Sequence, residues 1–230
     1  MSQFSTEKYI FKPHPYSSHS MIISWLEKVP KGTKILDIGT ATGCIGKIVQ
    51  HKGFELYGLE PEAEWSEVAR PFYRDILCSE LEHAESSYLS GYQVVLLADV
   101  LEYIPKPEKE LLRLTTLQPN GSIFIISVPN IANLWLRLNL LFGKFDYTDR
   151  GIMDFGHQCF ITRTTFLALL KQNGLQISTL HVTPIPIWLV NPFFVNTWAR
   201  KRIANVLMAL TRFWPTLFGY QWIAQCEVMK

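Results

Sequence analysis

Short runs of apolar residues recur along the chain, separated by stretches in which apolar positions have helical spacing. Runs with little polar alternation are typical of strands buried on both faces of a parallel sheet. They predict strands at residues 34–38, 54–59, 71–76, 92–98, 122–128, 175–182 and 220–228. Helical spacing and capping residues predict helices at 21–29, 62–70, 107–117, 131–142 and 165–172. The alternation predicts an α/β fold, a doubly wound, mostly parallel seven-stranded sheet with helices on both faces.

The chain is predicted to form a single domain over residues 1–230, because it contains no internal repeat and no linker. Residues 1–29 form an N-terminal arm and helix, and residues 30–182 form the core. Residues 184–219 are apolar, aromatic and proline-containing, and we expect a cap or interface insertion before the last strand. Residues 143–160 form a long polar and aromatic loop, of the kind that often carries function.

Composition narrows the functional classes. Hydrophobic residues make up 48% and charged residues 18%, which is typical of a globular protein and not of a disordered one. The net charge of +2 argues against a nucleic-acid partner. The cysteines form no Cys-x-x-Cys pair, so we expect neither a disulfide framework nor a metal site. Because the N-terminus has no apolar signal core, we expect a cytoplasmic protein.

The stretch KILDIGTATGCIG, residues 34–46, carries the most specific signal in the chain. It combines a short strand with Asp37 near its end, a turn containing Gly39 and Gly43, and the start of a helix. Such a turn exposes backbone N–H groups at the ligand-binding edge of a parallel sheet. Glu60 follows the next strand, about twenty residues later, where an acid typically holds a ribose diol. The pattern predicts an adenosine-containing cofactor.

Two families of cofactor are bound by an early glycine turn of this kind. A dinucleotide site needs G-x-G-x-x-G, and the spacing of Gly39, Gly43 and Gly46 does not match it. The Tyr-x-x-x-Lys pair of short-chain dehydrogenases is also missing from the sequence. Both observations disfavour a nicotinamide enzyme.

The turn instead resembles motif I, D-x-G-x-G-x-G, of the class I S-adenosylmethionine-dependent methyltransferases, with Ala41 in place of one glycine. Residues 97–130 resemble the fourth strand, helix and fifth strand of the same superfamily. Residues 143–174 resemble a subgroup often associated with bacterial cell-surface glycan synthesis. The resemblance covers about residues 30–182 and implies a Rossmann-like sheet with S-adenosylmethionine as the cofactor.

The resemblance also implies a set of cofactor-binding residues. Asp37 is expected near the amino-acid end of the cofactor, and Glu60 at both ribose hydroxyls. Asp75, after the third strand, is expected near the adenine amino group. The whole set comprises Asp37, Gly39, Thr40, Ala41, Gly43, Glu60, Pro61, Asp75 and, beside the reacting centre, Asp99, Val100 and Leu101.

Methyl transfer to oxygen or nitrogen also requires removal of a proton, so a base is useful. His157 is the best candidate, because it follows Asp154 in a D-x-x-H pattern and a neighbouring carboxylate could raise its basicity. The alternative is that His157 ties down the loop or touches the cofactor. Tyr103 replaces the histidine of the common LEHI sequence and is expected either to line the substrate pocket or to serve packing.

The acceptor is the least defined part of the prediction. Enzymes that methylate amino groups of DNA bases usually carry Asn/Asp-Pro-Pro-aromatic after the fourth strand, and residues 98–103 read ADVLEY. The subgroup resemblance indicates a hydroxyl of a small molecule, a sugar or a lipid-linked glycan. A quinone or another small metabolite is an alternative, and so is a non-catalytic cofactor-binding partner subunit.

The apolar segment 184–219 has two interpretations. It could be a cap over the substrate or the face of a homodimer. It could instead meet the inner face of the membrane as a peripheral surface, with Arg200, Lys201 and Arg202 near lipid phosphates.

Overall fold

The structure is a computed structural model and describes residues 16–186 and 197–230. Its strands are β1 (Lys34–Ile38), β2 (Glu55–Leu59), β3 (Asp75–Leu77), β4 (Val94–Ala98), β5 (Ile123–Pro129), β6 (Leu175–Pro184) and β7 (Gly219–Val228). They form one seven-stranded sheet in the order β3-β2-β1-β4-β5-β7-β6. β1 to β5 run parallel, and β7 is antiparallel to both β5 and β6. This topology confirms the predicted mostly parallel, doubly wound sheet.

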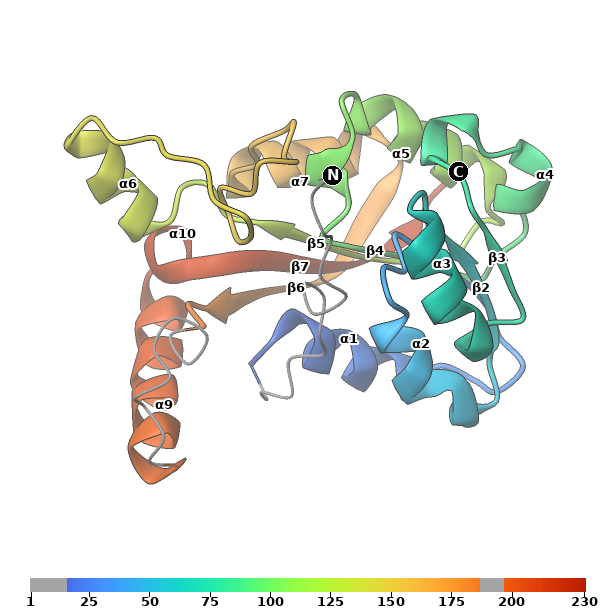
Figure 1. Cartoon of the computed structure of the whole chain (residues 1–230), viewed down its shortest axis with the longest axis horizontal. Coiled ribbons are helices and arrows are strands. Elements are labelled where there is room, and N and C mark those ends of the chain that lie inside the picture. The colour runs from blue at the N-terminus through green and yellow to red at the C-terminus, as the bar shows by residue number, and fades with distance from the viewer. Residues whose placement is uncertain (1–15, 187–196) are drawn as a thin grey trace.

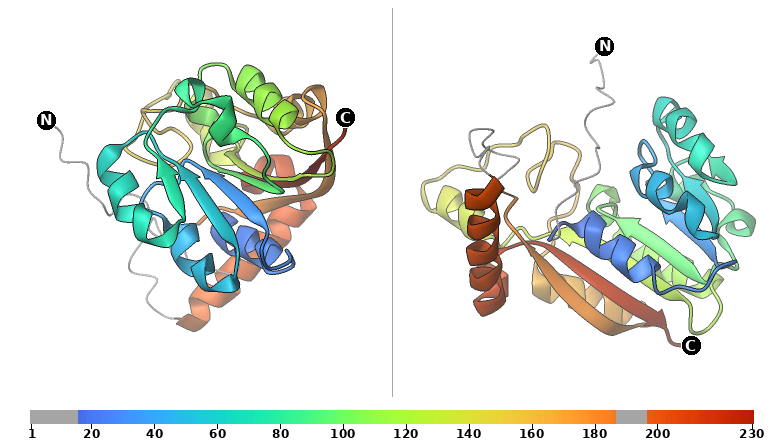
Figure 2. Two further views of the ribbon diagram at one scale, coloured as in Figure 1. Left: turned by 90° about the vertical axis from the view of Figure 1, so that its right-hand side faces the viewer. Right: turned by 90° about the horizontal axis from the view of Figure 1, so that it is seen from below.

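Helices cover both faces of this sheet. The α-helices are α1 (Ser18–Leu26), α2 (Cys44–Val49), α3 (Ala63–Ala69), α4 (Ser86–Leu89), α5 (Pro107–Leu117), α6 (Leu134–Leu141), α7 (Arg163–Gln172), α9 (Thr197–Phe213) and α10 (Pro215–Phe218). Short 3₁₀ helices are η1 (Gln50–Lys52), η2 (Arg70–Phe72), η3 (Leu81–His83) and η4 (Leu101–Tyr103). The sheet lies between α1, α2 and α3 on one face and α4, α5 and α7 on the other (Figure 1 and Figure 2).

Adjacent residues of the central strands point to opposite faces, and both faces are buried. Ile35 and Leu96 pack in the cluster that includes α1 and α2 side chains. Leu36 and Leu97 pack in the cluster that includes α5 and α7 side chains. Burial on both faces explains why these strands read as nearly continuous apolar runs in the sequence.

Several predicted boundaries differ from the structure, and two of the differences have a clear physical cause. The third strand was expected at 71–76, but β3 begins at Asp75. The chain leaves α3 through η2, which contains Pro71, and proline has no N–H to donate to a sheet. The first helix begins at Ser18 and not at residue 21, because the Ser17 hydroxyl accepts the backbone N–H of Ser20 as the N-terminal cap.

The apolar segment 184–219 is described in part. Residues 187–196 lie outside the described residues, as do residues 1–15 of the predicted arm. The rest of the segment forms α9 and α10, which contact each other, and α9 also contacts β6. α6 and α9 lie at the end of the molecule opposite to α2 and α3 (Figure 1).

Candidate functional site

The glycine turn after β1 packs closely against its neighbours. Gly39 and Gly43 have φ angles of 72° and 76°, in the left-handed region that glycine adopts without strain. A Cβ on Gly39 would lie 2.7 Å from the Val100 side chain, and a Cβ on Gly43 would lie 2.9 Å from the Ala69 Cβ. Both positions therefore require glycine for packing as well as for backbone conformation. The contact with Val100 joins the turn after β1 to the turn after β4.

Glu60 links the turns after β1 and β2. Its Oε2 accepts the Ala41 N–H at 2.7 Å and its Oε1 accepts the Glu62 N–H at 3.1 Å. The side chain is buried, and burial raises its pKa, while the two backbone hydrogen bonds lower it. Thr40 and Pro61 flank these contacts, and the Thr40 N–H donates to the Leu59 carbonyl.

Ala41 has a φ angle of 46°, so an alanine occupies a left-handed position where the resembled motif has glycine. Each Glu60 oxygen accepts one backbone donor and has capacity for a second. A carboxylate placed in this way can accept hydrogen bonds from a vicinal diol, and the ribose contact of Glu60 stays a prediction.

Asp37 is held from inside the protein. Its carboxyl is buried and its Oδ2 accepts the Tyr73 hydroxyl at 2.6 Å. Burial raises the pKa of Asp37 to about 7, the Tyr73 hydrogen bond acts in the opposite direction, and the charge of Glu60 adds to the rise. A contact of Asp37 with the cofactor therefore stays a prediction.

Asp99, the residue after β4, has a left-handed conformation, with φ of 57°. Its Oδ1 accepts the Ser127 hydroxyl and its Oδ2 accepts the Gln221 amide, each at 2.6 Å. These bonds tie β4 to β5 and β7 at the carboxyl edge of the parallel strands. A non-glycine residue with positive φ at such an edge is typical of a functional site. The next residues, Val100 and Leu101, lead into η4, and the Leu101 side chain belongs to the core.

The predicted place of Asp75 after the third strand is wrong. Asp75 is exposed and is the first residue of β3, paired in register with Tyr57. The residue that follows β3 is Cys78, whose thiol donates to the Pro61 carbonyl at 3.7 Å.

The base candidates lie together where the long loop meets η4. The rings of Tyr103 and His157 pack edge to face, 4.8 Å between centroids. His157 Nδ1 lies 3.0 Å from the Ile152 carbonyl oxygen, so Nδ1 carries the proton and Nε2 is the basic nitrogen of the neutral ring. Asp154 accepts the Gly156 N–H through Oδ1 at 2.9 Å, and its main-chain carbonyl accepts the His157 N–H at 3.0 Å. A main-chain carbonyl thus orients the imidazole through Nδ1.

η4 also contributes an acid that the sequence analysis did not select. Glu102 lies between Leu101 and Tyr103, which are both predicted site residues. Its side chain is only 1% exposed. Its main-chain carbonyl accepts the N–H groups of Gln158 and Cys159 at 2.7 and 3.0 Å. These bonds fasten the loop that carries His157 to η4.

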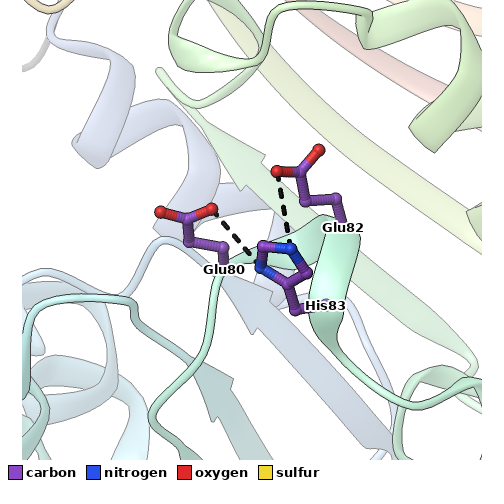
Figure 3. A group of neighbouring side chains, drawn as sticks. All are labelled: Glu80, Glu82 and His83. Carbon is purple, nitrogen blue, oxygen red and sulfur yellow. Dashed lines mark ion pairs between the residues drawn. The ribbon is translucent and has the colours of Figure 1, made fainter.

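Two surface features contain none of the predicted site residues. Glu80, Glu82 and His83 form an exposed cluster, with His83 3.5 Å from Glu80 and 3.8 Å from Glu82 (Figure 3). Their mutual ion pairs and their exposure describe a solvated surface group. A cavity of about 280 Å³ lies between α7, α10 and the last two strands, where Arg163 stacks over the Trp222 ring.

A family model described as a methyltransferase domain matches residues 20–180. The chain belongs to this methyltransferase family. Membership confirms the predicted enzyme class, whereas the glycan-associated subgroup stays a prediction. The fold of this methyltransferase resembles a SAM dependent methyltransferase from Archaeoglobus fulgidus, with a TM-score of 0.63, 14% identity, and coverage of 91% of this chain and 92% of that chain.

Further relatives share parts of the sequence or the fold. Magnesium protoporphyrin IX methyltransferase from Synechocystis PCC 6803, solved with bound SAH, has a TM-score of 0.60 and 15% identity over 92% of this chain and 82% of that chain. A ubiquinone biosynthesis O-methyltransferase of Pectobacterium atrosepticum is 26% identical over 46% of each chain, so the match spans about half of that relative. One from Escherichia coli O127:H6 is 25% identical over 67% of this chain and 68% of that protein.

Proposed function

We propose that this methyltransferase transfers a methyl group from S-adenosylmethionine to a hydroxyl oxygen of a small molecule, a sugar or a lipid-linked glycan. The oxygen assignment is supported by the similarity to ubiquinone biosynthesis O-methyltransferases, and the observation that supplies a base is the Nδ1 contact of His157 with the Ile152 carbonyl. That contact makes Nε2 the proton-accepting nitrogen beside η4, at the end of β4. A hydroxyl acceptor needs such a base, because it must lose a proton as the new bond forms.

The cofactor fits the residues around the glycine turn. When bound, S-adenosylmethionine supplies an electrophilic methyl group on a cationic sulfur. Glu60 would hold the ribose diol, because both of its oxygens have capacity for a further donor beside the Ala41 and Glu62 N–H groups. The backbone from Gly39 to Gly43 would line the cofactor, and Asp99 and Val100 would flank its methionyl part. In this arrangement Glu60 binds and orients, and His157 removes the proton from the acceptor.

A quinone or a related small metabolite is the second candidate acceptor. The similarity to ubiquinone biosynthesis O-methyltransferases supports it, at 25–26% identity. Those proteins are O-methyltransferases by name, so they support the same type of acceptor atom. A non-catalytic cofactor-binding subunit is the remaining alternative, and separate measurements of cofactor binding and turnover discriminate it from an enzyme.

An acceptor panel tests the proposal. The protein is incubated with isotope-labelled S-adenosylmethionine and, in separate reactions, with a monosaccharide, a catechol and a primary amine. Mass spectrometry and NMR then identify the labelled product and the methylated atom. We expect label on oxygen. Label on the monosaccharide supports the glycan assignment, and label on the catechol supports the quinone assignment. Label on nitrogen alone contradicts the proposed function.

We also propose that part of residues 184–219 forms a peripheral contact with the inner face of the membrane. Phe213 and Trp214, at the end of α9, are 84% and 52% exposed. Leu141 and Phe142, at the end of α6, are each 76% exposed. Among the described residues, no helix is long and apolar enough to cross a membrane. Exposed apolar groups of this size favour a surface contact, and a substrate cap or a homodimer face is the alternative.

A further inference from the structure

Glu102 is a buried acid with an unusual environment. Its side chain is 1% exposed, and its Oε2 has no hydrogen-bond partner among the described residues. An ionised carboxylate in such a place is costly, because burial removes its water, and the hydrogen bond from the Glu102 backbone N–H offsets this loss only in part. The neutral, protonated acid avoids most of this cost.

The charged groups that face Glu102 also favour its neutral form. Asp99 and Asp154 act on it electrostatically, and both are acids, while the Cys159 thiol lies within electrostatic range. Burial, followed by the charge of Asp99, raises the pKa of Glu102 well above its usual range. Burial and the two neighbouring acids therefore both favour the protonated form of Glu102.

Glu110 shows that burial alone does not create this environment. Glu110 is 3% exposed, in α5, but its Oε2 lies 3.2 Å from an Arg113 guanidinium nitrogen. The two acids are buried to a similar degree and differ in their partners. Glu110 is therefore a matched control for Glu102.

The position of Glu102 couples it to the proposed base. Its main-chain carbonyl holds the N–H groups of Gln158 and Cys159, the residues that follow His157. Tyr103, the next residue of η4, packs edge to face on the His157 ring. A displacement of η4 would therefore move the imidazole as well.

We propose that Glu102 is a proton-bearing positioning residue that holds η4 against the loop and so places His157. Loss of its proton would add a negative charge that Asp99 and, from the loop, Asp154 repel, and the repulsion by Asp154 would act to separate η4 from the loop. The consequence for catalysis rests on the proposed function. The positioning of His157 by Glu102 does not rest on the proposed function, and it can be measured without an acceptor.

Two measurements on the full chain test this inference, using wild type, Glu102→Gln, Glu102→Ala and Glu110→Gln. The first is hydrogen exchange of the peptide 154–160 at neutral pH. We expect Glu102→Gln to retain wild-type protection, because it is neutral and has the same shape. Glu102→Ala should exchange about tenfold faster, and Glu110→Gln should match wild type. Exchange in Glu102→Gln as fast as in Glu102→Ala, or unchanged exchange in Glu102→Ala, overturns the inference.

The second measurement is urea unfolding of wild type and Glu102→Gln as a function of pH. A raised native pKa destabilises the wild type as pH rises, because only the unfolded chain releases the proton. The ratio of their unfolding constants should therefore change about tenfold per pH unit above about pH 5, in favour of Glu102→Gln. A ratio that does not depend on pH means that Glu102 is ionised in the folded protein, and it overturns the inference. Cofactor affinity, measured for each variant, reports separately on the proposed function.

Discussion

Replacing Asp37 with asparagine should change how the stability of the protein depends on pH. Asp37 is buried, and its pKa is raised from 3.8 to about 7, mainly by burial. The folded state therefore prefers the neutral acid, while the unfolded chain ionises at lower pH. The contribution of Asp37 to stability is fully present below its unfolded pKa, and it is lost as pH rises towards its folded pKa. Asparagine does not titrate, so the variant lacks this loss.

The magnitude follows from the size of the shift. A shift from 3.8 to about 7 at about 1.4 kcal/mol per unit corresponds to a change on the order of 4 kcal/mol in the free energy of unfolding. The difference between Asp37→Asn and wild type should grow by this amount between about pH 4 and about pH 7. Any cost of the asparagine NH₂ group adds a constant, so the slope with pH is the relevant quantity.

Urea unfolding followed by tryptophan fluorescence measures this difference across the pH range. Tyr73→Phe is the companion variant, because it removes the hydrogen bond that lowers the pKa of Asp37. Because the folded pKa of Asp37 is then higher, the fall in stability should continue to higher pH than in wild type. A difference between Asp37→Asn and wild type that stays constant with pH would refute the buried-acid reasoning.

Three further predictions concern the cofactor turn and the apolar surface. Glu60→Ala should weaken S-adenosylmethionine binding by roughly 1–3 kcal/mol in calorimetry, whereas the control Glu55→Ala, at the other end of β2, should leave it unchanged. If Glu60→Ala binds the cofactor as tightly as wild type, Glu60 is not part of the site. Ala41→Gly should stabilise the protein by about 1 kcal/mol in urea unfolding, because the φ of 46° at Ala41 strains an alanine and not a glycine. A loss of stability in this variant would show that the backbone at Ala41 is not strained. Replacing Arg200, Lys201 and Arg202 with glutamate should reduce co-sedimentation with anionic vesicles without changing cofactor affinity. If the wild type does not bind vesicles at low salt, the cap or homodimer interpretation is favoured.

Much of the fold can be predicted from the sequence, because its central strands are buried on both faces. Continuous apolar runs mark β1, β4 and β5, and the helix predicted at 107–117 coincides with α5. β3 has only three residues and lies at the sheet edge, so its pattern is weak. The predicted strand includes part of the proline-containing turn before β3, so it begins at residue 71 and not at Asp75.

The site is predictable where its residues are close in sequence. Gly39, Ala41 and Gly43 belong to one turn, and their spacing was visible. Hydrogen-bond partners that are distant in sequence could not be predicted. Gln221 donates to Asp99 from 122 positions away in the chain, and Tyr73 donates to Asp37 from 36 positions away. The burial of Glu102 has no local signal, because it follows from the packing of a distant loop on η4.

His157 is the proposed base in methyl transfer to a hydroxyl oxygen. The most direct test measures single-turnover methyl transfer and S-adenosylmethionine affinity for wild type and His157→Ala, with the exposed His51→Ala as a control and the acceptor identified by the panel. We expect the transfer rate of His157→Ala to fall by about 10²–10⁴-fold while its cofactor affinity stays the same. The transfer rate and the cofactor affinity of His51→Ala should both equal those of wild type. An unchanged transfer rate, or a collapse of cofactor affinity in place of the rate, would contradict it.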